Sequence, residues 1–309
     1  MKSSTVPKVL FLVGPTGSGK SALALKLAKT LRGEIISADS MQVYKGMDIG
    51  TDKASRWTRR HIPHHLLDCV NLSHEFSVYE YRRLALRAVE LILKKKKMPV
   101  VVGGTGLYVK ALVDGISPRP GKSDNVRDRL AGEAAEKGLG ILFKRLEQID
   151  PVVAGRVHPN DEKRIFRALE VFELSGKRLS DLEKETVSLE QEGYRFVMAG
   201  LTLDRDELYR KIDGRVDSMF RKGLVREARG LYKKKLSVTA RQAIGYRELF
   251  DHFEGRITLE EAKNEIKQNT RNFAKRQITW FKRESRIRWF DPADENCARE
   301  IAQMARAEL

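Results

Sequence analysis

Short runs of consecutive hydrophobic residues recur along the chain and predict the buried strands of a parallel sheet. They occupy residues 9–13 (VLFLV), 34–38 (EIISA), 99–102 (PVVV) and 195–203 (RFVMAGLTL), with a further candidate at 286–290 (RIRWF). Strands covered by helices on both faces are hydrophobic throughout, not only at alternate positions. Helical spacing of hydrophobic residues follows the first run at 22–31 and precedes the third at 77–97. This alternation predicts an α/β fold.

The pattern changes between residues 116 and 191. This stretch has no buried-type strand and several charged helix candidates, and its turn signals are Pro118, Pro120, Gly121, Gly138, Pro151 and Pro159. We therefore expect residues 1–115 to form the first part of the α/β core and residues 116–191 a helical insertion. Residues 192–309 complete the core and are rich in helices, predicted at 205–222, 225–235, 240–253 and 258–283.

Composition indicates a soluble globular protein of one large or two unequal domains. The chain has 309 residues, of which 41% are hydrophobic and 33% charged. No hydrophobic run approaches the roughly 20 residues of a membrane span, and residues 1–8 lack a signal-peptide core. Two cysteines, Cys69 and Cys297, suit a reducing compartment. We expect a cytoplasmic protein that does not associate with membranes.

The charge balance points to a polyanionic partner. Lys and Arg exceed Asp and Glu by 17, which is large for a metabolic enzyme and typical of proteins that bind nucleic acid. A surface charge that only keeps the protein soluble is the simpler alternative.

A phosphate-binding loop follows the first hydrophobic run. Residues 14–21 read GPTGSGKS and fit the P-loop pattern at every fixed position, through Gly14, Pro15, Thr16, Gly17, Ser18, Gly19, Lys20 and Ser21. Glycines allow several backbone N–H groups to face one anion, Lys20 adds a positive charge, and the Ser21 hydroxyl suits Mg²⁺. The expected ligand is a di- or triphosphate. The loop by itself leaves open whether that phosphate belongs to a nucleotide.

Two polar residues end the second and third predicted strands. Asp39 follows residues 34–38, and Thr105 follows Gly103-Gly104 after residues 99–102. Carboxyl ends of parallel strands share one edge of a sheet, so both residues are expected beside the P-loop. Asp39 could instead cap its own turn, and Thr105 could cap the next helix. A Gly-Gly-Thr turn in place of a Walker-B carboxylate disfavours an ATP-driven motor.

The histidines of HIPHHLLD, which are His61, His64 and His65, do not predict a metal site. Pro63 interrupts any regular helix that could align them, and no cysteine or carboxylate set with zinc spacing completes a site. Packing, hydrogen bonding or a substrate loop are the favoured roles.

Two basic segments suit nucleic acid. In residues 160–167, Lys163, Arg164 and Arg167 fall within about one helical turn. Between residues 261 and 289, nine Lys or Arg against three Glu are interleaved with Phe273, Trp280, Phe281 and Trp289. Cations beside aromatic rings are typical of RNA binding, although aromatics at helical spacing often belong to a core.

Together these segments resemble the bacterial tRNA dimethylallyltransferases almost end to end. The resemblance rests on GPTGSGKS (14–21), DSMQVYKGMDIGTDK (39–53), HHLLD (64–68), PVVVGGTGLYVKALVDG (99–115), HPNDEKRIFRALEVFELSGK (158–177), RQAIGYREL (241–249) and AKRQITWF (274–281). Gly17 departs from the alanine of many members, which should not disturb a cradle of backbone amides. The family prenylates N6 of adenosine 37 in the anticodon loop, and its members have a P-loop NTPase-like core.

The resemblance implies a role for each motif residue. Residues 14–21 would hold the diphosphate of dimethylallyl diphosphate, with Mg²⁺ near Ser21, and Asp39, Thr105 and Arg215 would be catalytic. The implied tRNA contacts are Asp39, Ser40, Met41, Gln42, Thr105, Arg127, Lys163, Arg164, Ile165, Phe166 and Arg167. Within this set Gln42 would read the edges of an adenosine turned out of its stack. A monomer is expected.

Three alternatives remain at this point. A P-loop small-molecule kinase would bind ATP in the same loop, but would leave the excess positive charge unexplained. A non-enzymatic RNA-binding ATPase is disfavoured by the missing Walker-B carboxylate. An adenylate isopentenyltransferase acting on free nucleotides would not need the basic insertion.

Overall fold

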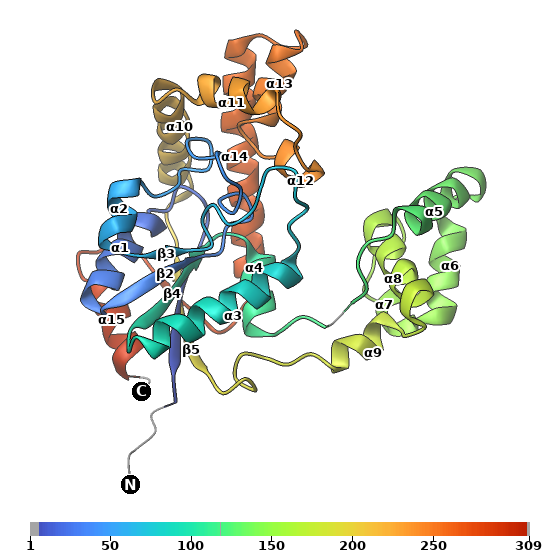
Figure 1. The fold of residues 1–309 in the computed structure, drawn as a ribbon, viewed down its shortest axis with the longest axis horizontal. Helices are drawn as coiled ribbons and strands as arrows, with labels where there is room; N and C mark the ends of the chain where they lie inside the picture. Colours follow the sequence, from blue (N-terminus) through green and yellow to red (C-terminus); the bar gives the residue numbers. More distant parts are fainter. Residues whose placement is uncertain (1–5, 118, 308–309) are drawn as a thin grey trace. The chain divides into compact units, whose positions relative to one another are not determined.

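A six-stranded parallel sheet forms the centre of the core (Figure 1). The computed structural model describes residues 6–117 and 119–307, so Pro118, a predicted turn residue, and residues 1–5 lie outside it. The strands are β1 (Lys8–Val13), β2 (Gly33–Ser37), β3 (His64–His65), β4 (Met98–Gly103), β5 (Arg195–Leu201) and β6 (Ile287–Phe290), in the spatial order β3-β2-β4-β1-β5-β6. The predicted α/β fold and all five predicted strands are confirmed. The two-residue β3 has no hydrophobic run, and the pattern did not predict it.

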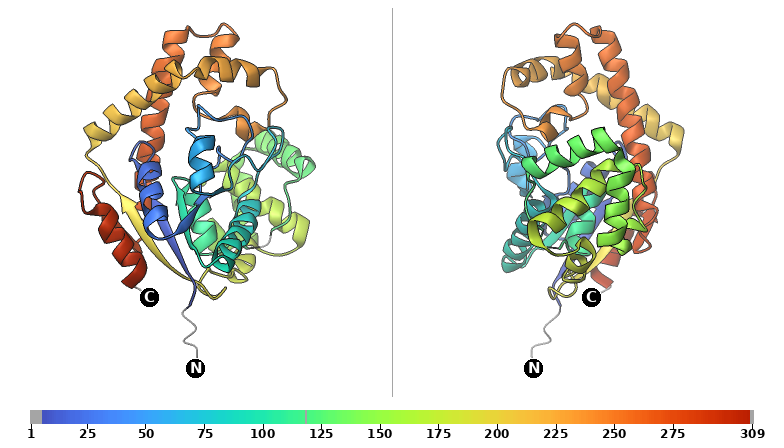
Figure 2. Two further views of the ribbon diagram at one scale, coloured as in Figure 1. Left: turned by 60° about the vertical axis from the view of Figure 1, so that its left-hand side comes forward. Right: turned by 90° about the vertical axis from the view of Figure 1, so that its right-hand side faces the viewer.

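Helices cover both faces of the sheet because side chains of each strand point alternately to either side. Phe11 of β1 packs in one hydrophobic cluster with α3 (Val78–Lys94), α4 (Gly106–Val113) and α14 (Leu259–Phe281). Leu12 packs in a second cluster with α1 (Lys20–Thr30) and α15 (Cys297–Ala307). Figure 2 shows α1 in blue and α15 in red on the same side of the sheet.

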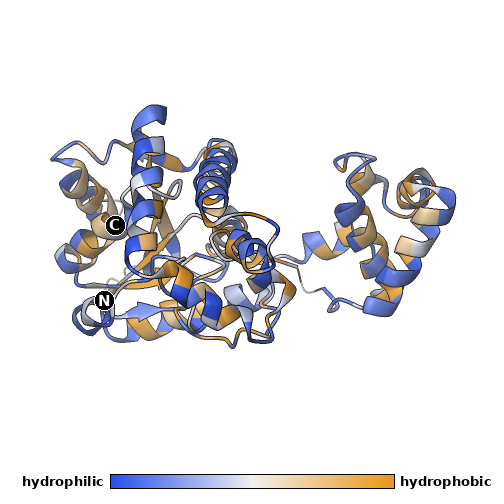
Figure 3. Ribbon diagram, turned by 90° about the horizontal axis from the view of Figure 1, so that it is seen from above, coloured by the Kyte–Doolittle hydropathy of each residue, from blue (hydrophilic) through white to orange (hydrophobic). Residues whose placement is uncertain are grey.

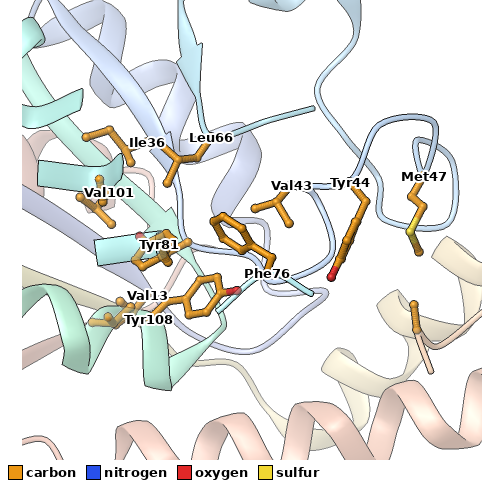
Figure 4. Close-up of a cluster of buried hydrophobic side chains, with 14 of the residues drawn as sticks. Val13, Ile36, Val43, Tyr44, Met47, Leu66, Phe76, Tyr81, Val101 and Tyr108 are labelled. Carbon is orange, nitrogen blue, oxygen red and sulfur yellow. The ribbon is translucent and has the colours of Figure 1, made fainter. Parts of the chain in front are cut away.

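The larger hydrophobic cluster supports the turn that follows β2. Tyr81 of α3 and Tyr108 of α4 stack with ring centroids 4.0 Å apart, and Phe76 meets Tyr108 edge-on. Figure 4 shows these rings beside Val43 and Tyr44, which belong to the turn after β2. Both turn residues are fully buried. The turn that carries Asp39, Ser40 and Gln42 is therefore supported by tightly packed hydrophobic side chains.

The remaining core helices largely follow the predictions. They are α2 (Arg56–His61), α10 (Arg205–Arg221), α11 (Leu224–Tyr232), α12 (Val238–Arg241) and α13 (Arg247–Phe253). The single helix predicted at 240–253 is wrong, since two short helices occupy this stretch. Gly245 between them has φ of 94°, which is incompatible with a continuous right-handed helix. The six-residue α2 buries none of its side chains, so no hydrophobic spacing could reveal it.

A second unit, Asp114–Ser188, has its own hydrophobic core. Its helices are α5 (Asp124–Lys137), α6 (Leu139–Ile149), α7 (Pro151–Ala154), α8 (Glu162–Ser175) and α9 (Leu179–Lys184), and its described residues contain no strand, as predicted. Figure 3 shows helices in both units that carry hydrophobic residues on one side and hydrophilic residues on the other. Within the described parts of the chain, no helix has the length and apolar character needed to cross a membrane.

Candidate active site

The P-loop lies between β1 and α1 and depends on its glycines. Gly14 has φ of 142°, and a Cβ atom there would lie 2.9 Å from the backbone oxygen of Leu201. Gly17 has φ of 82°, and a Cβ atom there would lie 2.9 Å from Cγ1 of Ile212, a flexible side chain. Alanine at position 17 would therefore need a strained backbone and a small shift of Ile212. The amides of the cradle would remain.

Lys20 lies at the start of α1 with its ammonium group turned back over the loop. Nζ donates hydrogen bonds to the Pro15 carbonyl oxygen at 2.5 Å and to Oγ of Ser18 at 3.3 Å. Burial, and next the positive charge of Arg215, lower the pKa of Lys20 to about 7, while Asp39 acts in the opposite direction. A bound anion would remove this electrostatic cost. The loop is thus built to receive negative charge.

Arg215 reaches the P-loop from α10. Its Nη1 donates a hydrogen bond to Oγ1 of Thr16 at 2.7 Å, and its Nε lies 3.4 Å from Oδ2 of Asp52. The guanidinium therefore lies beside the phosphate cradle, where the family resemblance places a catalytic arginine. Thr16 gives this arginine its position.

Gln277 connects the P-loop to the turn after β4. Its Oε1 accepts a hydrogen bond from the Thr16 amide at 2.8 Å, and its Nε2 donates to the Gly104 carbonyl oxygen at 2.9 Å. A Cβ atom at Gly104 would lie 2.1 Å from this Nε2, so a larger residue there would displace the Gln277 amide from this position. Sequence reasoning assigned Gln277 no role. The sequence signal that could have found it is a polar residue at a hydrophobic position of the helical pattern, and in the structure this residue is buried.

Asp39 caps its own turn and also lines the cavity beside the P-loop, so both positions suggested by the sequence are realised. Its Oδ1 accepts hydrogen bonds from the amides of Met41 at 2.8 Å and Gln42 at 3.2 Å, which caps the turn. Among the described residues, none donates a hydrogen bond to Oδ2. One carboxylate oxygen fixes the side chain, and the other is available for chemistry.

Thr105 and Gln42 lie on either side of this turn. Oγ1 of Thr105 accepts a hydrogen bond from the Ser40 amide at 3.1 Å. Gln42 accepts from Oγ of Ser37 at 2.9 Å and donates to the Thr51 carbonyl oxygen at 3.0 Å. Both ends of the Gln42 amide are thus bound within the protein, where they connect the turn to Thr51.

Two cavities meet at Asp39. The first, of about 350 Å³, includes Lys20, Ser21 and Gln42 in its lining, and we name it the P-loop cavity. The second, of about 440 Å³, includes Ser40, Met41, Thr105, Arg247 and Asn269, and we name it the acceptor cavity. Four residues line both cavities: Thr16, Asp39, Arg215 and Phe273. Two molecules bound side by side would therefore meet at a carboxylate and a guanidinium.

Ion pairs hold the segment 44–53 that bounds the P-loop cavity. The buried Nζ of Lys53 contacts Oδ1 of Asp68 at 2.6 Å, Oδ1 of Asp48 at 3.0 Å and the Tyr44 carbonyl oxygen at 2.5 Å. Arg59 of α2 also pairs with Asp68 at 2.5 Å. These contacts give a role to Lys53 of the motif at 39–53 and to Asp68 of HHLLD, which the sequence alone did not assign.

The histidines have protein partners. Nδ1 of His64 lies 2.7 Å from the Ile62 carbonyl oxygen, and burial lowers the pKa of His64. Nε2 of His65 lies 2.8 Å from Oε2 of the buried Glu34. Across residues 6–117 and 119–307, no group of three or more His, Cys, Asp or Glu side chains could hold a metal ion.

The predicted RNA-contact residues of α8 occupy two different environments. Lys163 and Arg164 are exposed. Ile165 and Phe166 are buried in the core of the second unit, so the tRNA contact implied for them is not available to their side chains in this structure. A helix with one hydrophobic face necessarily turns such neighbours inward.

Arg127 and Arg167 hold the second unit together. The fully buried carboxylate of Glu170 accepts hydrogen bonds from Nε of Arg127 at 2.8 Å and Nη1 of Arg167 at 2.7 Å. It also accepts from the Ser123 amide at 2.8 Å. These hydrogen bonds outweigh the effect of burial and lower the pKa of Glu170 to about 2. Both arginines therefore neutralise a buried charge, a role that their spacing did not predict.

Comparison with known proteins identifies the family of this chain. The model of the family described as IPP transferase matches residues 42–284. The chain belongs to the IPP transferase family. The predicted resemblance is confirmed. A second family model, Isopentenyl transferase, matches residues 7–65, which include the P-loop and Asp39.

Individual members of the family are similar over almost the whole chain. The tRNA dimethylallyltransferase of Geobacter metallireducens is 48% identical over 293 residues, covering 94% of both chains. The tRNA isopentenylpyrophosphate transferase of Bacillus halodurans is 38% identical with a TM-score of 0.70, covering 98% of this chain and 96% of the other. A eukaryotic dimethylallyltransferase acting on tRNA is 28% identical with a TM-score of 0.83, covering 98% and 79%. The two solved structures share the fold of this chain.

Proposed function

We propose that this protein transfers the dimethylallyl group of dimethylallyl diphosphate to N6 of adenosine 37 in the anticodon loop of tRNA. The observation that carries the proposal is the position of Asp39 and Arg215 in the lining of both cavities, one of which contains a P-loop. The relatives named tRNA dimethylallyltransferase support the choice of substrates.

In the reaction, the bond between C1 of the donor and its diphosphate oxygen breaks, and the electron pair leaves with the diphosphate. The N6 atom of adenine forms the new bond to C1 and loses one proton. Oδ2 of Asp39 accepts that proton as general base, while the Met41 and Gln42 amides hold Oδ1 in place. Lys20 and Arg215 stabilise the charge of the leaving diphosphate.

The residues present fit a magnesium ion held mainly by the donor. Mg²⁺ prefers oxygen ligands and is commonly bound by few protein groups together with substrate phosphates and water. The Ser21 hydroxyl is exposed and lines the P-loop cavity with the carboxylates of Asp39 and Asp52. Ser21 would hold the ion, which when bound neutralises charge on the diphosphate.

The distribution of charge favours RNA as the acceptor. Residues 114–188 contain 14 Lys or Arg and 14 Asp or Glu, so the excess of 17 positive charges lies in the rest of the chain. On the part of α14 up to residue 271, Lys263 and Lys267 pair with Asp217, and Arg271 pairs with Asp213.

On the second half of α14 and just beyond it, four exposed cations pair with no carboxylate of the described residues: Lys275, Arg276, Lys282 and Arg283. Arg276 lines the acceptor cavity, and the neighbouring Trp280 is 42% exposed. Unpaired cations beside an exposed aromatic ring suit an RNA backbone with unstacked bases.

The function is tested with radiolabelled dimethylallyl diphosphate, Mg²⁺ and an unmodified anticodon stem-loop containing A36-A37-A38. We expect label at A37 together with released diphosphate. Label on AMP but not on RNA would indicate an adenylate isopentenyltransferase. Consumption of ATP without any labelled product would indicate a kinase and would overturn the proposal.

A further inference from the structure

A buried carboxylate lies next to the acceptor cavity and has no role in the chemistry above. The side chain of Glu248, at the start of α13, is 1% exposed. Its Oε2 accepts a hydrogen bond from the Gly245 amide at 2.8 Å. Its Oε1 accepts from Nη2 of Arg247 and from Nδ2 of Asn269, both at 2.8 Å. Arg247, Asn269 and Gly245 all line the acceptor cavity.

This carboxylate determines which way the Asn269 amide faces. An ionised carboxylate only accepts hydrogen bonds, so the amide must turn its NH₂ group toward Glu248. Oδ1 of Asn269 consequently points away from Glu248, and no group in residues 6–117 or 119–307 donates a hydrogen bond to it. The acceptor cavity therefore contains an oriented hydrogen-bond acceptor that the protein itself leaves unused.

The spacing along α14 separates this acceptor from the reacting groups. Gln277 contacts the P-loop, Phe273 lines both cavities and Asn269 lines only the acceptor cavity. These residues are four apart and lie on one helix face, with a rise of about 6 Å per step. Asn269 is thus about 12 Å along the helix from the P-loop contact.

The only N–H donors of the reacting adenine are the two on N6, and this nitrogen must face Asp39 and the donor carbon in the proposed reaction. One of these N–H groups gives its proton to Asp39, and the other stays on the same nitrogen. The other ring atoms on its edges, N1, N3 and N7, are acceptors. Because Asn269 lies about 12 Å along α14 from the P-loop contact, we consider another N–H or O–H group of the RNA as the partner of Oδ1, either the ribose 2′-hydroxyl of the target nucleotide or the exocyclic amine of a neighbouring base.

We propose that Asn269 is a specificity-determining residue that accepts a hydrogen bond from a second donor of the RNA, and that Glu248 is the residue that positions it. This inference rests on the proposed function and adds a recognition contact distinct from the reacting amine. A hydrogen-bond acceptor of this kind discriminates because a substrate that lacks the donor leaves it unpaired in the complex.

The test measures kcat/KM for four stem-loops with the wild type and Asn269→Ala. One RNA is unmodified, one has 2′-deoxyadenosine at position 37, and two have purine riboside, which lacks the amine, at position 36 or 38. We expect one analogue to react about tenfold more slowly with the wild type, as for the loss of one hydrogen bond. The kcat/KM of Asn269→Ala should fall by a similar factor with the unmodified RNA, and it should not fall further with that analogue. The analogue identifies the donor as ribose or base.

Other outcomes separate the two proposals. An equal loss for Asn269→Ala on all four RNAs would overturn the contact, whereas failure of the wild type to label the unmodified RNA would overturn the proposed function instead. Asn264→Ala, on the exposed part of the same helix, is the matched control and should equal the wild type.

Glu248→Gln should partly reproduce the loss of kcat/KM seen in Asn269→Ala while KM for the donor stays constant, because a glutamine can let the Asn269 amide rotate. If Glu248→Gln discriminates among the four RNAs as strongly as the wild type does, Glu248 does not position Asn269.

Discussion

Nη1 of Arg215 donates a hydrogen bond of 2.7 Å to Oγ1 of Thr16, across 199 residues of sequence. This contact places a permanent positive charge from α10 against the phosphate cradle. We expect Arg215→Gln to lower kcat/KM by about 10²–10³, the usual cost of removing one group that stabilises a leaving anion. Rapid-quench assays with labelled donor would measure it. Arg210→Gln, on the same helix but exposed, should remain active, and similar losses in both variants would contradict the assignment.

Asp39 should tolerate an isosteric substitution structurally but not catalytically. In Asp39→Asn, Oδ1 can still accept from the Met41 and Gln42 amides, so the turn and RNA affinity are retained. The base is lost, and turnover should fall by about 10² or more. Asp39→Ala should lose the same activity and also about 1 kcal/mol of stability, because the capped turn is opened. Single-turnover rates and thermal unfolding separate the two effects. Normal turnover of Asp39→Asn would exclude the general-base role.

Binding of diphosphate should take up a proton. Burial and the charge of Arg215 lower the pKa of Lys20 from its ordinary value of 10.5 to about 7, so the amine is mostly neutral above pH 7 without ligand. A bound diphosphate favours the charged form. Affinity should therefore fall as pH rises above 7, by up to about tenfold per pH unit.

Calorimetry at pH 8 in buffers of different ionisation enthalpy measures that proton uptake, which should approach one proton per diphosphate. Lys20→Met should abolish the proton uptake. Lys20→Arg should bind diphosphate without proton uptake, because arginine is already charged. Uptake that persists in Lys20→Met would assign the proton to another group.

Glu170 should control the stability of the second unit. Its pKa is about 2 in the folded state against an ordinary value of 4.5. A lowered carboxyl pKa stabilises the fold fully above pH 4.5, and that stabilisation is lost as pH falls from 4.5 toward 2. We expect Glu170→Gln to cost about 2–3 kcal/mol, since it leaves two arginines without their shared partner.

Hydrogen exchange of amides in α5 and α8 measures this effect locally, as a function of pH. Glu162→Gln, an exposed carboxylate at the start of the same helix, serves as control and should exchange like the wild type. Unchanged protection in Glu170→Gln would show that the cluster does not stabilise the unit.

The salt dependence of RNA binding should distinguish cations that bind phosphate from structural ones. Lys275→Glu and Lys282→Glu should each flatten the plot of log K against log salt, by about 0.7–0.9 for every phosphate that the side chain no longer neutralises. Lys163→Glu with Arg164→Glu should flatten it too if α8 contacts the RNA backbone. Arg127→Met should instead destabilise the second unit with little change of slope, because Arg127 is bound to Glu170. Nitrocellulose filter binding over a salt series measures the slopes, and parallel plots for all variants would contradict these assignments.

The sequence by itself determined the features that depend on contiguous residues. The spacing of glycines in 14–21 specifies a phosphate cradle because backbone geometry is local, and uninterrupted hydrophobic runs specify strands buried on both faces. Parallel strands bring their carboxyl ends to one edge, so the approach of Asp39 to the P-loop also followed from the pattern. The ordered motifs then indicated the family, and with it Arg215.

Only the tertiary structure decided how distant side chains are used. The contacts of Gln277 with Thr16 and of Glu248 with Asn269 arise from packing α14 against the core, and no periodicity encodes them. From their spacing alone, Arg127 and Arg167 look like surface cations. In the structure the Glu170 carboxylate is buried, and both arginines are its hydrogen-bonded partners. A charge pattern reports which residues are polar. Whether a polar group faces solvent, a substrate or a buried partner depends on what the fold places opposite it.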